Sequence, residues 1–185
     1  MRRESRTYYG WTERGFDAKV YNTIFSTKYP DTLFVSSGGN TELDQRSDIA
    51  IAILGKVFND IEILVLKDMD MASGKEVNQQ SRNEYLSLNP SNHRVLKRFE
   101  IENYLFDKEV LRNYCNINGK AFDEEAYDAY FTDIVNQNIK NGTGRIKNIC
   151  GINTPVNGSV FKEELAKYFY EDMDVYKELE SSIFH

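Results

Sequence analysis

Two aspartates, Asp68 and Asp70, stand just beyond the apolar run Ile63–Leu66. A run that is apolar at every position is typical of a strand buried on both faces of a parallel sheet. Ligands of open α/β sheets bind beyond the carboxyl ends of such strands. In extended backbone, residues two apart project to the same side, so both carboxylates can bind one ion. Carboxylate oxygens suit Mg²⁺ or Mn²⁺, and the pair therefore predicts a divalent-metal site.

Four other acidic residues are candidates to extend this site. Glu13 and Asp17 flank a predicted strand-to-helix junction, although the helix dipole alone also explains an acid at Asp17. Glu100 and Glu102 project to one side only if their segment is extended, and in a helix they diverge by about 200°. The extended form predicts that they hold a second metal ion. The plain alternative for Asp68 is a solubilising turn residue after the strand.

Basic residues near the second pair are candidates for contact with phosphate. Arg94, Lys97 and Arg98 precede Glu100 and are predicted to bind the backbone of a nucleic acid. The alternative is an exposed, charged strand edge. The chain has only two histidines, so acid/base chemistry based on histidine has little to work with.

The bulk composition limits the class of protein. A length of 185 residues fits one domain or one domain with an appendage. The net charge of −6 disfavours a simple basic nucleic-acid coat, but metal ions neutralise carboxylates in a nuclease. Cys115 and Cys150 are too few for a disulfide framework or a structural zinc site. With no long apolar run and no signal peptide, we expect a cytoplasmic protein without membrane contact.

Hydrophobic periodicity predicts alternating strands and helices in the first part of the chain. The order strand, helix, strand, helix, strand with short turns indicates a parallel sheet with crossover helices. The second helix is expected to bury Ile49, Ile53, Leu54 and Val57. The predicted strands are 7–12, 33–36, 63–68 and 94–99, and the predicted helices are 17–25 and 41–58.

From Asp107 onward the pattern is helical, and Asn141–Gly144 is expected to be a flexible break. We therefore expect a catalytic α/β domain over residues 1–112 and a helical extension over 113–185. From Asp107 onward, the predicted helices are 107–114, 123–137, 159–170 and 173–182.

Three motifs in this order resemble the TOPRIM domain, in the version found in OLD-family (overcoming lysogenisation defect) nucleases and related phage-defence proteins. The first is Glu13-Arg14-Gly15-Phe16-Asp17, in which Arg14 replaces a usual glycine. A strand followed by Gly38-Gly39 lies between the first and second motifs. The second motif is the strand that ends in Asp68-x-Asp70. The third is the stretch Arg98–Leu105, which matches Arg/Lys-x-Glu-x-Glu-Asn-Tyr-Leu and is the most specific of the three.

The resemblance implies a TOPRIM-like (Rossmann-like), mostly parallel sheet flanked by helices. It implies a metal-dependent endonuclease that uses Mg²⁺ or Mn²⁺, with two ions. Glu13, Asp68 and Asp70 would hold one ion, and Asp17 with the glutamates of the third motif would hold the other. The resemblance also implies a catalytic lysine late in the chain, which is Lys162, with Lys147 as the fallback. Gly158 lies four residues before Lys162, whereas the family has glycine and lysine adjacent.

Family members work in anti-phage defence with an ABC-type ATPase, and this chain has no Walker motif. The resemblance therefore implies an ATPase subunit or fused domain as a partner, besides the DNA or RNA substrate. Homo-oligomers formed through the helical tail are a further expectation. Two other readings stay open: a TOPRIM toxin that acts on RNA such as tRNA, and a non-catalytic interaction domain that keeps only the fold.

Overall fold

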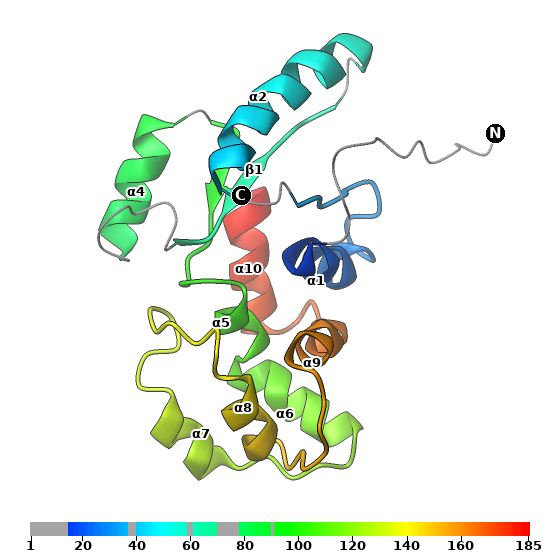
Figure 1. Ribbon diagram of the computed structural model, residues 1–185, viewed down its shortest axis with the longest axis vertical. Helices are drawn as coiled ribbons and strands as arrows, with labels where there is room; N and C mark the ends of the chain where they lie inside the picture. The colour runs from blue at the N-terminus through cyan, green and yellow to red at the C-terminus, as the bar shows by residue number, and fades with distance from the viewer. Residues whose placement is uncertain (1–14, 37–39, 59–60, 70–77, 90) are drawn as a thin grey trace, which may run out of the picture.

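The protein has a mixed α/β architecture in which helices flank a small parallel sheet (Figure 1). The computed structural model describes residues 15–36, 40–58, 61–69, 78–89 and 91–185. The expected first strand, 7–12, lies outside these residues. An α/β fold with a parallel sheet is therefore confirmed, while the finer assignment to the TOPRIM fold stays a prediction.

The sheet of the described residues has two strands, β1 (Val65–Lys67) and β2 (His93–Val95). They run parallel, with Val65 opposite His93 and Lys67 opposite Val95. The predicted third strand thus forms, shorter than the predicted range at both ends. Helix α4 (Gln79–Leu88) lies between β1 and β2 in the sequence and packs beside β2. Because the strands are parallel, their carboxyl ends lie at the same edge of the sheet.

Two of the expected strands differ from the observed structure. Residues 33–36 form only an isolated bridge at Ser36, and the Asn22 side chain holds them by two hydrogen bonds to the Phe34 backbone, of 2.8 and 2.9 Å. The expected strand 94–99 ends at Val95, because the chain bends over residues 97–100. This bend lets the Tyr104 hydroxyl accept two consecutive backbone N–H groups, from residues 97 and 98, at 3.1 Å each.

The first two helices form within one residue of their predicted bounds, as α1 (Phe16–Phe25) and α2 (Asn40–Val57). The prediction that α2 buries its apolar face is wrong. Ile49, Ile53 and Val57 are 59%, 57% and 63% exposed. The reason is the position of α2, which lies beside β1 and away from the main group of packed helices (Figure 1).

The helical region after β2 contains more and shorter helices than expected. Helix α7 ends at Tyr130 instead of continuing to 137, since Phe131 has extended backbone. In the segment that follows, the Asn103 side chain donates to the backbone carbonyls of Ile134 and Gln137. The expected flexible break at 141–144 contains the start of a helix. The elements are α5 (Glu102–Leu105), α6 (Lys108–Ile117), α7 (Glu124–Tyr130), α8 (Thr143–Ile149), α9 (Gly158–Leu165), a 3₁₀ turn (Ala166–Tyr168) and α10 (Asp174–Phe184).

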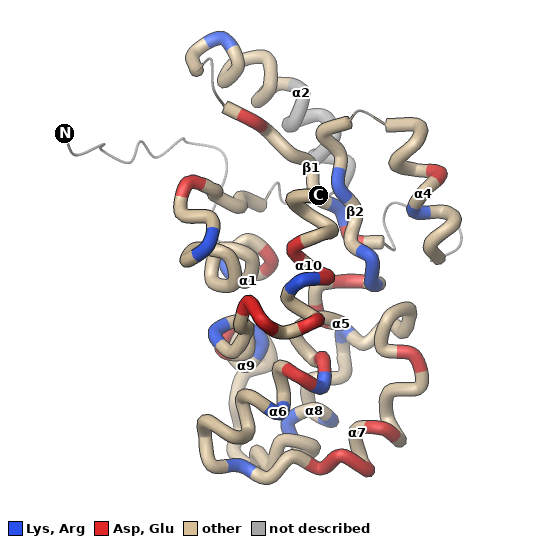
Figure 2. Tube along the Cα trace, turned by 180° about the vertical axis from the view of Figure 1, so that it is seen from behind, with Lys and Arg blue, Asp and Glu red and all other residues tan. Residues whose placement is uncertain are grey.

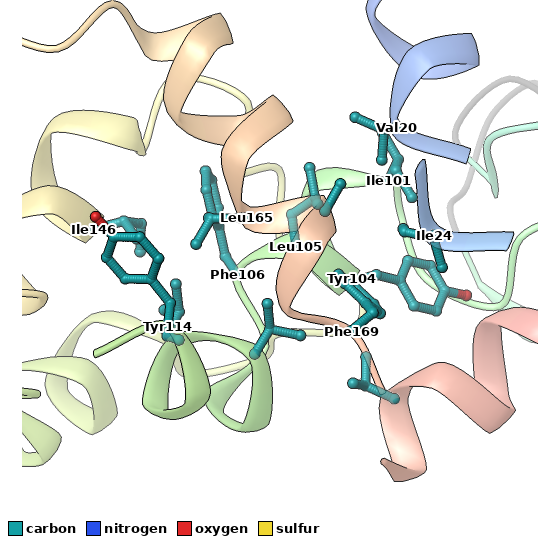
Figure 3. Packing of buried hydrophobic residues seen from close by; sticks show 14 of the residues in the cluster. Val20, Ile24, Ile101, Tyr104, Leu105, Phe106, Tyr114, Ile146, Leu165 and Phe169 are labelled. Atoms are coloured by element: carbon teal, nitrogen blue, oxygen red, sulfur yellow. The ribbon is translucent and has the colours of Figure 1, made fainter. Parts of the chain in front are cut away.

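One cluster of buried apolar side chains joins these parts. Figure 3 shows Val20 and Ile24 of α1 beside the α5 residues, and Leu165 of α9 beside Phe106. The cluster continues to Ile146 of α8. Residues on both sides of the expected boundary at 112/113 therefore contribute to the same core. No helix among the described residues is long and apolar enough to cross a bilayer.

Candidate metal and phosphate site

Of the two aspartates after β1, Asp68 is described and Asp70 lies outside the described residues, as does Glu13. Asp68 follows β1 directly and is partly buried. The next residue, Met69, donates its N–H to the Phe99 carbonyl at 3.1 Å. Asp68 thus lies where the chain leaving β1 meets the chain leaving β2, as predicted for the carboxyl edge of a parallel sheet.

The third motif folds as a closed turn. The N–H of Asn103 donates to the Glu100 carbonyl at 3.1 Å, and its side-chain oxygen accepts the N–H of Glu100 at 3.0 Å. Helix α5 begins at the next acidic residue, Glu102. The segment is therefore not extended, and the geometric condition under which Glu100 and Glu102 would share an ion is not met. Both side chains are buried, and Glu100 stays a predicted ligand.

Glu102 forms a buried ion pair with Lys162, the predicted catalytic lysine. The Lys162 Nζ lies 2.8 Å from the Glu102 Oε1, and the side chains are 11% and 5% exposed. The same Nζ donates to the Lys140 carbonyl at 3.2 Å and lies 5.4 Å from the Phe16 ring centroid. Helices α1, α5 and α9 meet at this point, and Figure 2 shows acidic and basic segments side by side around α5 and α9. The fold thus brings together two predicted site residues that are 60 positions apart.

Asp17, in the first turn of α1, lies within the electrostatic range of this pair. Its side chain keeps access to solvent, yet the surrounding protein weakens its hydration and raises its pKa. The negative charge of Glu102 raises the pKa of Asp17 further, while Lys140 and Lys162 lower it. Asp17 and Glu102 thus share one electrostatic environment with Lys140 and Lys162.

Tyr21 is buried near several of the candidate carboxylates. Burial is the main reason that its pKa is well above the usual value for tyrosine. The charges of Asp68, Asp17 and Glu102 then raise the pKa of Tyr21 further. Three carboxylates from three separate segments therefore lie within electrostatic range of this side chain. The sequence held a signal for it, since Tyr21 stands one helical turn after Asp17.

The predicted phosphate-binding residues Arg94, Lys97 and Arg98 all contact α10. The Arg94 Nε donates to the backbone carbonyl of residue 183 at 3.1 Å, and the Lys97 Nζ donates to the Ser181 hydroxyl at 2.7 Å. Their predicted contact with a nucleic acid stays a prediction, and the structure assigns them a role in attaching α10.

Of these three cations, Arg98 forms the most hydrogen bonds and ion pairs. Its guanidinium binds both oxygens of Glu178, at 3.1 and 2.9 Å, and the Oδ2 of Asp107 at 2.7 Å. It also lies over the Tyr104 ring, 4.9 Å from the centroid, and is only 6% exposed. A guanidinium with this many partners stabilises the fold around the third motif.

Lys147, the alternative catalytic lysine, lies in a different environment. Its Nζ donates to the Val156 carbonyl at 2.9 Å. The residue lines an open depression of about 510 Å³ between α8 and the loop at Ile152–Pro155. Asp17, Asp68 and Glu102 do not line this depression. Between the two lysines, the contact with Glu102 favours Lys162.

Comparisons of the chain with models of protein families, with curated proteins and with solved structures found no significant match. The TOPRIM resemblance therefore depends on the three motifs alone.

Proposed function

We propose that this protein is a metal-dependent nuclease that cleaves phosphodiester bonds. The observation that supports the proposal most directly is the buried contact between Glu102 and Lys162, which brings together two candidate site residues, while Asp68 stands at the carboxyl end of β1. The buried Lys162 at Glu102 adds the cation that phosphoryl chemistry requires.

The chemistry of the donor set fits Mg²⁺ or Mn²⁺, which prefer carboxylate oxygens. Among the described residues, no three acidic, cysteine or histidine side chains are close enough together to hold an ion. Asp68, Asp17 and Glu102 therefore form part of a ligand set, which the proposal completes with Glu13 and Asp70. A divalent ion bound there supplies a Lewis acid that activates water and stabilises a leaving oxygen.

The protein's own residues have distinct parts in this proposal. Lys162 is proposed to offset negative charge on the phosphate, and its Nζ is held by Glu102 and by the Lys140 carbonyl. Glu13 is the candidate general base, because it is predicted at the end of the first strand. Asp17 and Glu102 add negative charge that favours a second ion.

The biological setting follows from the same resemblance. We propose that the protein is an effector of bacterial anti-phage defence and works with an ABC-type ATPase. DNA is the first substrate to test, and RNA such as tRNA is the alternative, because phosphodiester cleavage at a metal site applies to both. A non-catalytic domain would neither bind the ion nor cleave either polymer.

The test measures cleavage of labelled DNA and of labelled RNA with Mg²⁺ or Mn²⁺ by the wild type, Asp68→Ala and Glu13→Gln. We expect both variants to lose activity by at least about a hundredfold while circular dichroism shows an unchanged fold. The matched control is Asp128→Ala, which removes an exposed aspartate that pairs with Lys108 at the surface. Full activity in both site variants would exclude this site, and a wild type that cleaves neither polymer would exclude the function.

A further inference from the structure

The cations around the carboxylates differ in what already binds them. The ammonium of Lys162 is held by Glu102 and by a backbone carbonyl. The guanidinium of Arg98 is held by Glu178 and Asp107. The side chain of Lys140 is exposed, and within the described part of the chain its ammonium forms no hydrogen bond or ion pair.

The backbone of Lys140 is fixed next to the buried ion pair. Its carbonyl accepts the hydrogen bond from the Lys162 Nζ at 3.2 Å. The preceding residue, Ile139, is 2% exposed and belongs to the core, and its carbonyl accepts the N–H of Gly142 at 2.7 Å. The loop thus presents the Lys140 side chain to solvent from an anchored position.

Lys140 also lies near a carboxylate of the site. Its carbonyl is 3.2 Å from the Lys162 Nζ, which is itself 2.8 Å from the Glu102 Oε1. A nucleic acid that approaches this site meets several carboxylates, and the whole protein has a net charge of −6. Local positive charge is needed to hold a polyanion there, even when metal ions neutralise some of the acids.

We propose that Lys140 binds a backbone phosphate of the nucleic-acid substrate beside the carboxylates, and that it is the substrate-positioning cation of this site. The inference rests on the proposed function, and it assigns to Lys140 the task that the sequence predicts for Arg94, Lys97 and Arg98. A lysine ammonium on a flexible stem suits this task, since it binds phosphate as a point charge without a fixed geometry. The sequence had no signal for it, because the residue lies in a loop outside every motif.

The test measures binding of a short fluorescein-labelled single strand, as DNA and as RNA, by fluorescence anisotropy over a range of salt concentrations. Ca²⁺ replaces Mg²⁺ so that cleavage does not compete with binding. We expect Lys140→Ala to weaken binding about fivefold and to reduce the slope of log K against log salt by about 0.7. Lys140→Arg should restore both values, because the phosphate contact requires charge and not a particular shape.

The matched control is Lys177→Ala, which makes the same change in net charge on α10, where the lysine contacts the Asp172 carbonyl and Asp174. It should leave the affinity and the slope unchanged. If Lys140→Ala and Lys177→Ala bind equally while the wild type binds the strand, the assignment of Lys140 is overturned and the nuclease proposal survives. If the wild type binds neither strand, both proposals are overturned.

Discussion

Two ion pairs connect the third motif to later helices, each with its motif residue buried, and they differ in how completely their charges are neutralised. Arg98 binds Glu178 through two nitrogens and Asp107 through a third. Lys162 binds a single oxygen of Glu102, and the carboxylate of Asp17 lies within range of both partners. Arg98 thus belongs to a network of hydrogen bonds with two carboxylates. Lys162 instead contacts one carboxylate oxygen, with a second carboxylate, that of Asp17, nearby.

The difference shows that charged residues close together in one motif can have separate tasks. A bidentate guanidinium–carboxylate pair with a third partner satisfies its donors and fixes geometry. A lysine ammonium that meets one carboxylate oxygen and one carbonyl is easier to displace, because it holds fewer directed bonds. We infer that the Arg98 network stabilises the fold, and that the Lys162–Glu102 pair keeps the site's charge balanced when no divalent ion is bound.

Replacing Arg98, the cation with more partners, should have the largest effect on stability. Arg98→Ala leaves Glu178 and Asp107 without their common partner, and we expect it to lower the free energy of unfolding by about 4 kcal/mol. Urea denaturation measures this loss. Arg112→Ala is the control, because that arginine pairs with Glu124 at the exposed surface and should cost about 1 kcal/mol or less. Equal losses in the two variants would show that the buried network has no special role.

Lys162→Met should have a somewhat smaller effect and should respond to metal. It leaves the Glu102 carboxylate buried without its cation, which we expect to cost about 3 kcal/mol. Mn²⁺ should then raise the melting temperature of Lys162→Met more than that of the wild type, since the ion replaces the missing positive charge. Arg98→Ala should gain no such extra rescue. A melting temperature of Lys162→Met that Mn²⁺ does not change would refute the distinction between the two pairs.

The start of α1 should tolerate no side chain at Gly15. A Cβ there would lie 2.3 Å from the Ser36 Cβ, so either α1 or the 33–36 segment must shift. We expect Gly15→Ala to cost about 2 kcal/mol and to displace Asp17 from the site. Gly15→Ala combined with Ser36→Gly should regain most of that loss. Gly55→Ala, which meets no atom within 4 Å in α2, should be neutral or stabilising and serves as the control. A melting temperature of Gly15→Ala equal to that of the wild type would contradict the close approach to Ser36.

The sequence correctly predicted the helices and the strand that depend on patterns of neighbouring residues. The bounds of α1 and α2 follow from helical periodicity, and the parallel pairing of β1 follows from its apolar run. The prediction that the apolar face of α2 is buried was wrong, because periodicity identifies an apolar stripe without saying what covers it. The segment after α7 is held by Asn103, which lies more than 30 residues away from the carbonyls to which it donates, so a local pattern does not reveal it.

The candidate site was predictable to a similar extent. Residue types and spacing identified Asp17, Asp68 and Glu102 as candidates, and the family resemblance added Lys162. The fold places Glu102 and Lys162 in contact. The roles of the basic residues were not accessible, because the partners of Arg98 stand 9 and 80 positions along the chain. A cation's task depends on which acids the fold brings to it, and a single sequence does not contain that information.

Isothermal titration calorimetry with Mn²⁺ tests the central claim most directly. The wild type should bind Mn²⁺, and Asp68→Asn and Glu102→Gln should each weaken the affinity at least about tenfold, because each removes a charged oxygen donor. The control Asp128→Asn should bind as the wild type does. Binding by the wild type that depends on neither Asp68 nor Glu102, or an absence of binding, would contradict the claim that these carboxylates form a divalent-metal site.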